Sequence, residues 1–153
     1  MAQDSFDHSW HVAAEPGAVF AHLADPHSYL GLSPLIVAVR DVSEGVDDSG
    51  QPFVAYTAVE RFKAGPVRLW DNPIAVTMRV DAGAARIRQD VVSPGRVRLT
   101  SLLVLTPESG GTRLDERIEL TMPRLLRGFV RGQARSVQLY RAGELSRRLT
   151  ATA

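Results

Sequence analysis

The chain opens with a segment in which every second residue belongs to a face expected to be buried, alternating with polar residues. Two segments that each begin with a proline follow. The positions of the covered phase are Phe6, His8, Trp10 and Val12. Such a period of two is typical of a β-strand with one buried face. Pro16 and Pro26 each fit the first turn of a helix, where a missing N–H has no partner to lose. We therefore predict one strand and then two short helices, the second capped by Asp25 and ended by Ser33-Pro34.

From Leu35 to Met122 the chain changes to apolar and β-branched runs separated by turn signals. The turns are expected at 47–50, 64–66, 81–83, 93–95 and 109–111. Six strands fit between them, and the connections are too short for helical crossovers, so the pairing should be antiparallel. Two later strands show which face is covered: the pattern buries Ile87, Gln89, Val91, Leu114, Glu116, Ile118 and Leu120.

After Pro123 the sequence predicts a long amphipathic helix that extends to Leu149. Its apolar positions recur every three or four residues, at Leu126, Phe129, Val130, Ala134, Val137 and Tyr140. Such a helix is roughly 40 Å long, against roughly 30 Å for a nine-residue strand, so it can cross a whole sheet. Gly128 and Gly132 within it predict a bend or a close contact on that side.

The order of these elements predicts an α+β fold with an internal cavity. A twisted seven-stranded antiparallel sheet curls, and one helix laid on its concave side does not fill the space as a second sheet would. Residues 1–153 are expected to form a single domain around this space.

The residues themselves are similar to those of a known family. The stretch from Ala13 to Pro26, AAEPGAVFAHLADP, resembles the opening signature of the SRPBCC superfamily, the helix-grip proteins that include START lipid-transfer domains and polyketide cyclase/dehydrase-like proteins. GGTRL at 110–114, Met122-Pro123 and FVRGQAR at 129–135 resemble its last strand and gripping helix. Many members have a tryptophan before the proline that follows the second short helix, whereas this chain has Gly31-Leu32-Ser33-Pro34. The resemblance implies binding of a hydrophobic or amphipathic molecule between sheet and helix, with catalysis in some members only.

Composition narrows the class of protein. The 153 residues are 44% hydrophobic and 23% charged, they include no cysteine, and no run of eighteen apolar residues or export signal is present. These features favour a cytoplasmic protein without disulfides or thiolate metal sites and without a transmembrane segment. The four histidines lie within the first 27 residues, and His8 and His11 would point to opposite faces of a strand. We expect no metal and no cofactor, and the oligomeric state is left open.

Charge is unevenly distributed although the net value is only +1. Residues 124–148 hold seven arginines and one glutamate, while eleven basic and sixteen acidic residues lie elsewhere. Arg127, Arg131 and Arg135 follow one another at i, i+4 spacing. We interpret them as a solvated face balanced by the acidic remainder; an acidic partner or an anionic lipid surface is the alternative. No nucleic-acid partner is expected, because no aromatic residues alternate with these arginines to stack on bases.

Polar residues in the covered phases are the candidate site, because a buried polar group needs a partner. They are His8, Gln89, Ser101 and Glu116 on strands and Gln133 on the helix; Tyr56 and Glu60 share a strand phase whose facing the pattern does not fix. Burial would raise the pKa of Glu116 and make it a general base, or Glu116 sits at the open end of the sheet, paired with an arginine or water. For the other groups, structural hydrogen bonds are the alternative.

The function that follows is binding of a lipid, polyketide or aromatic metabolite, as a carrier or a sensor. The expected ligand-binding residues are Trp10, Tyr56, Gln89, Ser101, Phe129 and Gln133. The alternative is a cyclase or dehydratase in which Glu116, with His8, transfers protons.

Overall fold

The computed structural model describes residues 1–150, which form one curved antiparallel sheet, two longer helical segments and two 3₁₀ turns. The strands are β1 (Ala2–Val12), β2 (Ile36–Val46), β3 (Pro52–Ala64), β4 (Val67–Asp81), β5 (Arg86–Ser93), β6 (Val97–Glu108) and β7 (Gly111–Met122). The helices are α1 (Pro16–Leu23), η1 (Pro26–Tyr29), η2 (Arg124–Leu126) and α2 (Arg127–Thr150). Within the described residues this confirms the expected α+β fold with seven strands.

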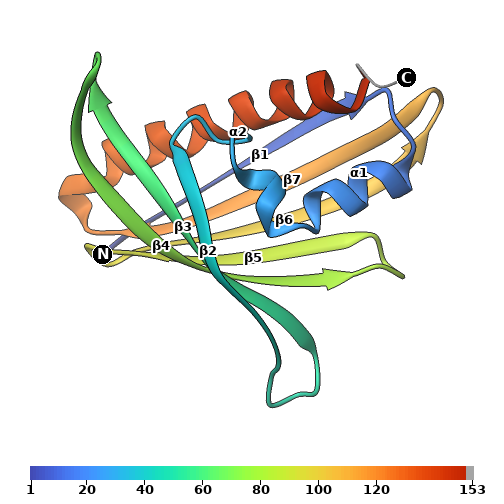
Figure 1. The fold of residues 1–153 in the computed structure, drawn as a ribbon, viewed down its shortest axis with the longest axis horizontal. Helices are drawn as coiled ribbons and strands as arrows, with labels where there is room; N and C mark the ends of the chain where they lie inside the picture. Colours follow the sequence, from blue (N-terminus) through green and yellow to red (C-terminus); the bar gives the residue numbers. More distant parts are fainter. Residues whose placement is uncertain (151–153) are drawn as a thin grey trace.

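The strand order places the first and last strands, β1 and β7, side by side at one edge of the sheet. The order is β1-β7-β6-β5-β4-β3-β2, with every neighbouring pair antiparallel. The sheet curls around α2, which runs along its concave side close to β1, while α1 and η1 connect β1 to β2 at one end (Figure 1). Because α2 packs against β1 and β7, the inner face of β3, β4 and β5 is left uncovered by the helix.

The covered strand phases lie where the sequence predicts them. Ile87, Gln89, Leu114, Glu116 and Ile118 are all buried, whereas the intervening arginines of β5 and β7 are exposed. The outer face of the sheet carries ion pairs, including Arg117 with Asp7 and Arg113 with Asp115. The alternation therefore separates an apolar inner face from a charged outer face.

The two halves of α2 are held differently. In the C-terminal half Ala142 and Leu145 are buried, and the guanidinium of Arg148 donates to the backbone carbonyls of Ser28 in η1 (2.7 Å) and of Leu30 just after it (2.9 Å). In the N-terminal half only partly buried side chains, Val130 and Ala134 among them, pack against the small cluster of Ile118, Leu120 and Met122. The helix thus closes one end of the molecule and leaves the other end loosely covered.

Two expectations about the helical segments are wrong. The second short helix is a single 3₁₀ turn that ends at Tyr29, well before Pro34, although the Asp25 side chain caps it as predicted by accepting from the His27 N–H. Of the two alternatives expected at Gly128 and Gly132, the close contact is wrong, since a Cβ added at either would meet nothing within 4 Å, and the bend stays a prediction. The apolar stripe is also incompletely buried.

Two residues of the stripe, Phe129 and Tyr140, are 53% and 47% exposed. Because α2 lies over only one side of the sheet, part of its apolar stripe has no apolar surface of the sheet to pack against.

Candidate functional site

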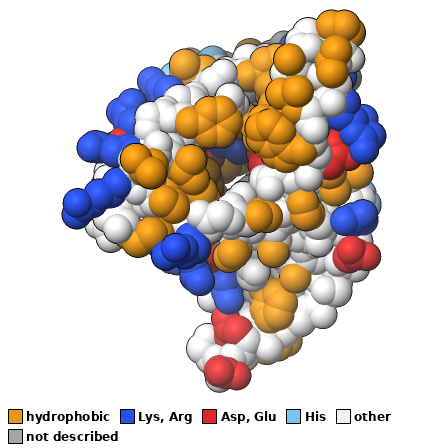
Figure 2. All heavy atoms as spheres, turned by 90° about the vertical axis from the view of Figure 1, so that its left-hand side faces the viewer, with side chains coloured by type: hydrophobic (Ala, Val, Ile, Leu, Met, Phe, Trp, Pro, Cys, Tyr) orange, Lys and Arg blue, Asp and Glu red, His pale blue; other side chains and the backbone are white. Residues whose placement is uncertain are grey.

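A cavity of about 380 Å³ lies between the sheet and α2. It opens on the face shown in Figure 2, where hydrophobic side chains surround a hollow. Its volume falls in the range of small-molecule binding pockets. The predicted space between the curled sheet and the helix therefore exists.

The walls of the cavity are mostly apolar and come from both layers. The sheet contributes side chains of β2 to β7 and the helix contributes side chains from its first four turns. The apolar residues that line the middle are Ala58, Ile74, Val76, Val91, Leu99, Ile118, Leu120, Val130 and Val137. A hydrophobic molecule placed here would exchange water for hydrocarbon contacts on both sides.

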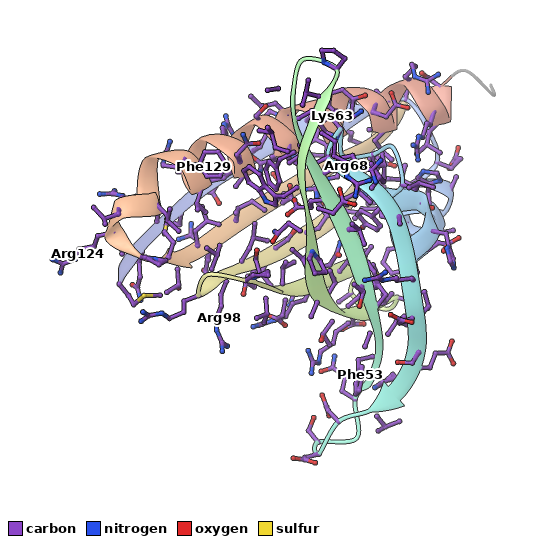
Figure 3. The ribbon with its side chains drawn as sticks, turned by 60° about the vertical axis from the view of Figure 1, so that its left-hand side comes forward. Phe53, Lys63, Arg68, Arg98, Arg124 and Phe129 are labelled. Carbon is purple, nitrogen blue, oxygen red and sulfur yellow. The ribbon has the colours of Figure 1, made fainter. Side chains whose placement is uncertain are left out.

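The mouth of the cavity lies between the β3–β4 hairpin and the start of α2. Phe62 stacks on Trp70 with ring centroids 4.7 Å apart and meets Phe129 across the opening at 6.2 Å. Trp70 and Phe129 are about half exposed, and Leu125 is 99% exposed. Figure 3 shows Phe129 on the helix and the cationic side chains of Lys63 on β3, Arg68 on β4 and Arg124 on η2, just before α2. The mouth is thus aromatic, with basic groups around it.

The inner end of the cavity is polar. The Tyr56 hydroxyl donates to Gln89 Oε1 at 2.9 Å, and the Tyr29 hydroxyl donates to the carbonyl of Leu23 at 2.7 Å. Burial raises the pKa of both tyrosines, so both stay neutral phenols at ordinary pH. Arg141 reaches the same end from α2.

Arg141 is tied to a buried carboxylate behind the cavity wall. Glu116, 3% exposed, accepts from Arg141 Nη2 at 2.5 Å, from Ser101 Oγ at 2.6 Å and from Gln138 Nε2 at 3.2 Å. Burial acts to lower the pKa of Arg141, but the Glu116 carboxylate and the nearby tyrosines raise it above its ordinary value. Arg141 therefore stays charged, and its Nε and Nη1 make no hydrogen bond to residues 1–150.

A second polar group lines the cavity nearer the mouth. Asn72 Nδ2 donates to Glu60 Oε1 at 3.3 Å and to Ser93 Oγ at 3.1 Å. Burial raises the pKa of the Glu60 carboxyl, and the hydrogen bond from Asn72 opposes that rise. Glu60 faces inward because it shares the strand phase of Tyr56 on β3, which the structure turns toward the cavity.

The sequence-predicted residues divide into two groups and one outlier. Tyr56, Gln89, Phe129 and Gln133 line the cavity. Trp10, Ser101 and Glu116 instead line a space of about 10 Å³ behind its inner end, which is room for about one water molecule. His8 lines neither space; its half-buried ring stacks on Trp10, with centroids 5.2 Å apart.

Glu116 combines features of the two interpretations of the sequence. It is buried away from bulk solvent, as the functional interpretation requires, and it is also paired with an arginine, as the structural interpretation requires. Arg141, Ser101 and Gln138 all donate to it, so the carboxylate is saturated with donors.

The arginine stripe of α2 is balanced by the acidic strand beside it. Arg127 and Arg131 both lie within 3.4 Å of Asp4 on β1, and Arg135 donates to Gln138 and to the backbone carbonyl of Asp7. These contacts agree with the interpretation of a solvated face whose charge the remainder of the chain balances.

Sequence reasoning missed Arg141 and Gln138, which give the inner end its character. The sequence did contain a signal that points to Arg141. Ala134, Val137 and Leu145 continue the helical spacing of the apolar stripe, and position 141 falls within it, where an arginine is out of place. Asn72 was missed because the phase of β4 is hard to read across Pro73.

Neither a cluster of metal-binding side chains nor a membrane-spanning helix is found in the described part of the chain. No group of three or more acidic or histidine side chains in residues 1–150 is placed to hold a metal ion. No helix among the same residues is both long and apolar enough to cross a membrane.

Comparison with known proteins identifies the fold. The sequence matches no family model and no curated protein. Among solved structures, the protein TTHA0849 from Thermus thermophilus has a TM-score of 0.73 at 20% identity, covering 98% of this chain and 99% of that one. The ZhuI aromatase/cyclase from Streptomyces sp. R1128 has a TM-score of 0.73 at 16% identity, covering 96% of both chains. A START superfamily protein from Mycobacterium smegmatis has a TM-score of 0.69 at 13% identity, covering 97% of this chain and 99% of that one.

Proposed function

Because the chain has the helix-grip fold of the SRPBCC superfamily, we propose that it binds a hydrophobic or amphipathic small molecule in the cavity between sheet and helix. The protein would act as a carrier or a sensor of a lipid, polyketide or aromatic metabolite. The observation that carries the proposal is the cavity of about 380 Å³ with apolar walls and a charged arginine at its inner end. A cytoplasmic location, which the composition favours, stays part of the proposal.

Arg141 indicates which end of the proposed ligand carries its polar group. Two of its nitrogens have no partner in the described chain, and the Glu116 carboxylate already balances the positive charge of its guanidinium. An oxygen acceptor, such as a ketone, phenol or carboxylate oxygen, would complete the hydrogen bonding of this cation. Gln133 offers a further amide from the helix side. We propose that the ligand places its oxygenated end inward and its hydrocarbon along the apolar walls.

The cyclase or dehydratase alternative is not favoured by the two residues expected to serve it. His8 does not line the cavity, and the Glu116 carboxylate is occupied by Arg141, Ser101 and Gln138. A general base must reach the proton that it removes. We therefore assign Glu116 the positioning of Arg141 in place of proton transfer.

Filling the cavity tests the proposed function. Val137 lines the cavity from α2, whereas Leu139, two residues on, is 45% exposed. Native mass spectrometry of protein purified from its own host should show a bound small molecule, and Val137→Trp should lose it while the matched control Leu139→Trp keeps it. Retention of the same molecule by a folded Val137→Trp protein would place it elsewhere and contradict the proposal.

A further inference from the structure

Glu60 is a carboxylate that faces the ligand cavity without a cationic partner. In residues 1–150 its side chain has one hydrogen bond, the 3.3 Å contact from Asn72 to Oε1, and no ion pair. The neighbouring Arg61 points to the opposite face of β3, where it pairs with Asp71 at 2.8 Å. The oxygen Oε2 of Glu60 therefore has no partner from the described part of the protein.

The buried carboxylate of Glu116, behind the inner end of the cavity, is surrounded quite differently. Glu116 receives hydrogen bonds from three side chains, one of them charged. A carboxyl group taken out of water without such partners is destabilised, and burial raises the pKa of Glu60 accordingly. Glu60 is only partly buried, so its free oxygen remains accessible to a hydrogen-bond donor, either water or a bound molecule in the cavity.

We propose that Glu60, with Asn72 and Ser93, forms a polar subsite that binds a hydrogen-bond donor of the ligand, an O–H or N–H group. This inference rests on the proposed function and specifies the class of ligand. Glu60 accepts from the donor, Asn72 holds the carboxylate in place, and Ser93 holds the Asn72 amide. An alcohol, a phenol or an ammonium group has the required chemistry.

The subsite also fixes a spacing for the ligand. Glu60 and Tyr56 are four residues apart on the same face of β3, which corresponds to roughly 13 Å along the strand. Ala58 and Ile74, which are paired on β3 and β4, separate the two polar levels with hydrocarbon. The preferred ligand therefore carries a donor toward the mouth and an acceptor oxygen near Arg141, with an apolar middle.

Matched naphthalene probes test the subsite in the intact protein. 2-Naphthol and 2-naphthylmethylamine each offer a donor, whereas 2-methoxynaphthalene offers none, and isothermal titration calorimetry gives the three affinities. A hydrogen bond to a charged acceptor should favour each donor probe over the ether by about tenfold. Glu60→Leu should abolish both preferences and leave ether binding intact, whereas Glu44→Leu, at an exposed site on β2, should keep them.

The variant Glu60→Gln distinguishes the naphthol probe from the amine probe. It also serves as a second variant in case Glu60→Leu fails to fold. It keeps the shape and an acceptor oxygen, so the preference for naphthol should be reduced while the preference for the amine is lost. Equal affinity of the wild type for naphthol and ether, or an unchanged preference in Glu60→Leu, overturns the subsite alone. Failure of the wild type to bind even the ether counts against the proposed function, and the subsite fails with it.

Discussion

The ion pair of Glu116 with Arg141 gives the sharpest test of how the inner end of the cavity is built. Glu116→Gln keeps the size of the side chain but leaves the Arg141 guanidinium, 16% exposed, without a counter-charge. Removal of one partner of a buried pair costs about 3–5 kcal/mol. We expect the lower end, about 3 kcal/mol, because Arg141 borders the cavity and the glutamine still accepts from Ser101. For a chain of this length that is a fall in Tm of roughly 6–12 °C.

A double-mutant cycle separates the pair from its surroundings. Urea unfolding followed by tryptophan fluorescence gives the free energy of unfolding for the wild type, Glu116→Gln, Arg141→Met and the double variant. Because each single change strands a buried charge and the double change does not, the double variant should be more stable than additivity predicts by about 2 kcal/mol.

The exposed ion pair on the outer face is the control. Arg113 and Asp115 are about half exposed, so Asp115→Asn should alter the free energy of unfolding by less than about 1 kcal/mol. A Glu116→Gln protein as stable as the wild type, or an additive cycle, would refute the assignment of Glu116 as the residue that holds Arg141. Proton transfer by Glu116 would then be the better explanation of its burial.

Three further predictions concern stability. Asp25→Ala removes the side-chain cap of η1 and should cost about 1 kcal/mol, read as a loss of roughly 2–4 °C in Tm. Trp10→Phe removes a buried Nε1 that has no partner in the described chain, so urea unfolding should show a cost below about 1.5 kcal/mol; a larger loss would mean that this N–H is bonded, for example to a water in the small space beside it. Hydrogen bonds from Ser49 to Asp47 and from Arg147 to Glu144 lower the pKa of each carboxyl to about 2. Since the folded-state pKa lies below the unfolded one, their stabilisation is present above about pH 5 and lost as the pH falls toward 2, so Asp47→Asn should flatten the fall of Tm over this range; an unchanged acid profile would contradict it.

The strand phases show how far the sequence alone reaches. Arg86, Ile87, Arg88 and Gln89 alternate with a period of two, and because successive side chains on a strand point to opposite faces, the buried set follows directly. The same local logic identified Asp25 as the cap of a short helix, since its side-chain oxygen needs only an N–H two residues away.

The contacts within the candidate site could not be inferred from local sequence patterns. Glu116 was recognisable because a carboxylate stood in a covered phase, but its partner Arg141 is 25 residues further along the chain, and no spacing rule connects a strand to a helix across a cavity. Glu60 was ambiguous for a related reason: the residues of β3 are partly buried on both faces near the mouth, so their period does not reveal which face is inner.

The sequence by itself determined the order of elements, the antiparallel meander and the hydrophobic inner face, because these depend on neighbours within a few residues along the chain. Only the tertiary structure decided that α2 packs toward β1 and leaves a hollow over β3, β4 and β5. It also decided that Glu60 lines this hollow with one oxygen unpaired in the described chain, that Glu116 lies behind it with its hydrogen bonds filled, and that His8 lines neither space. Those outcomes depend on how a curled sheet and a rigid helix meet in space, which is set by the packing of side chains far apart in the sequence.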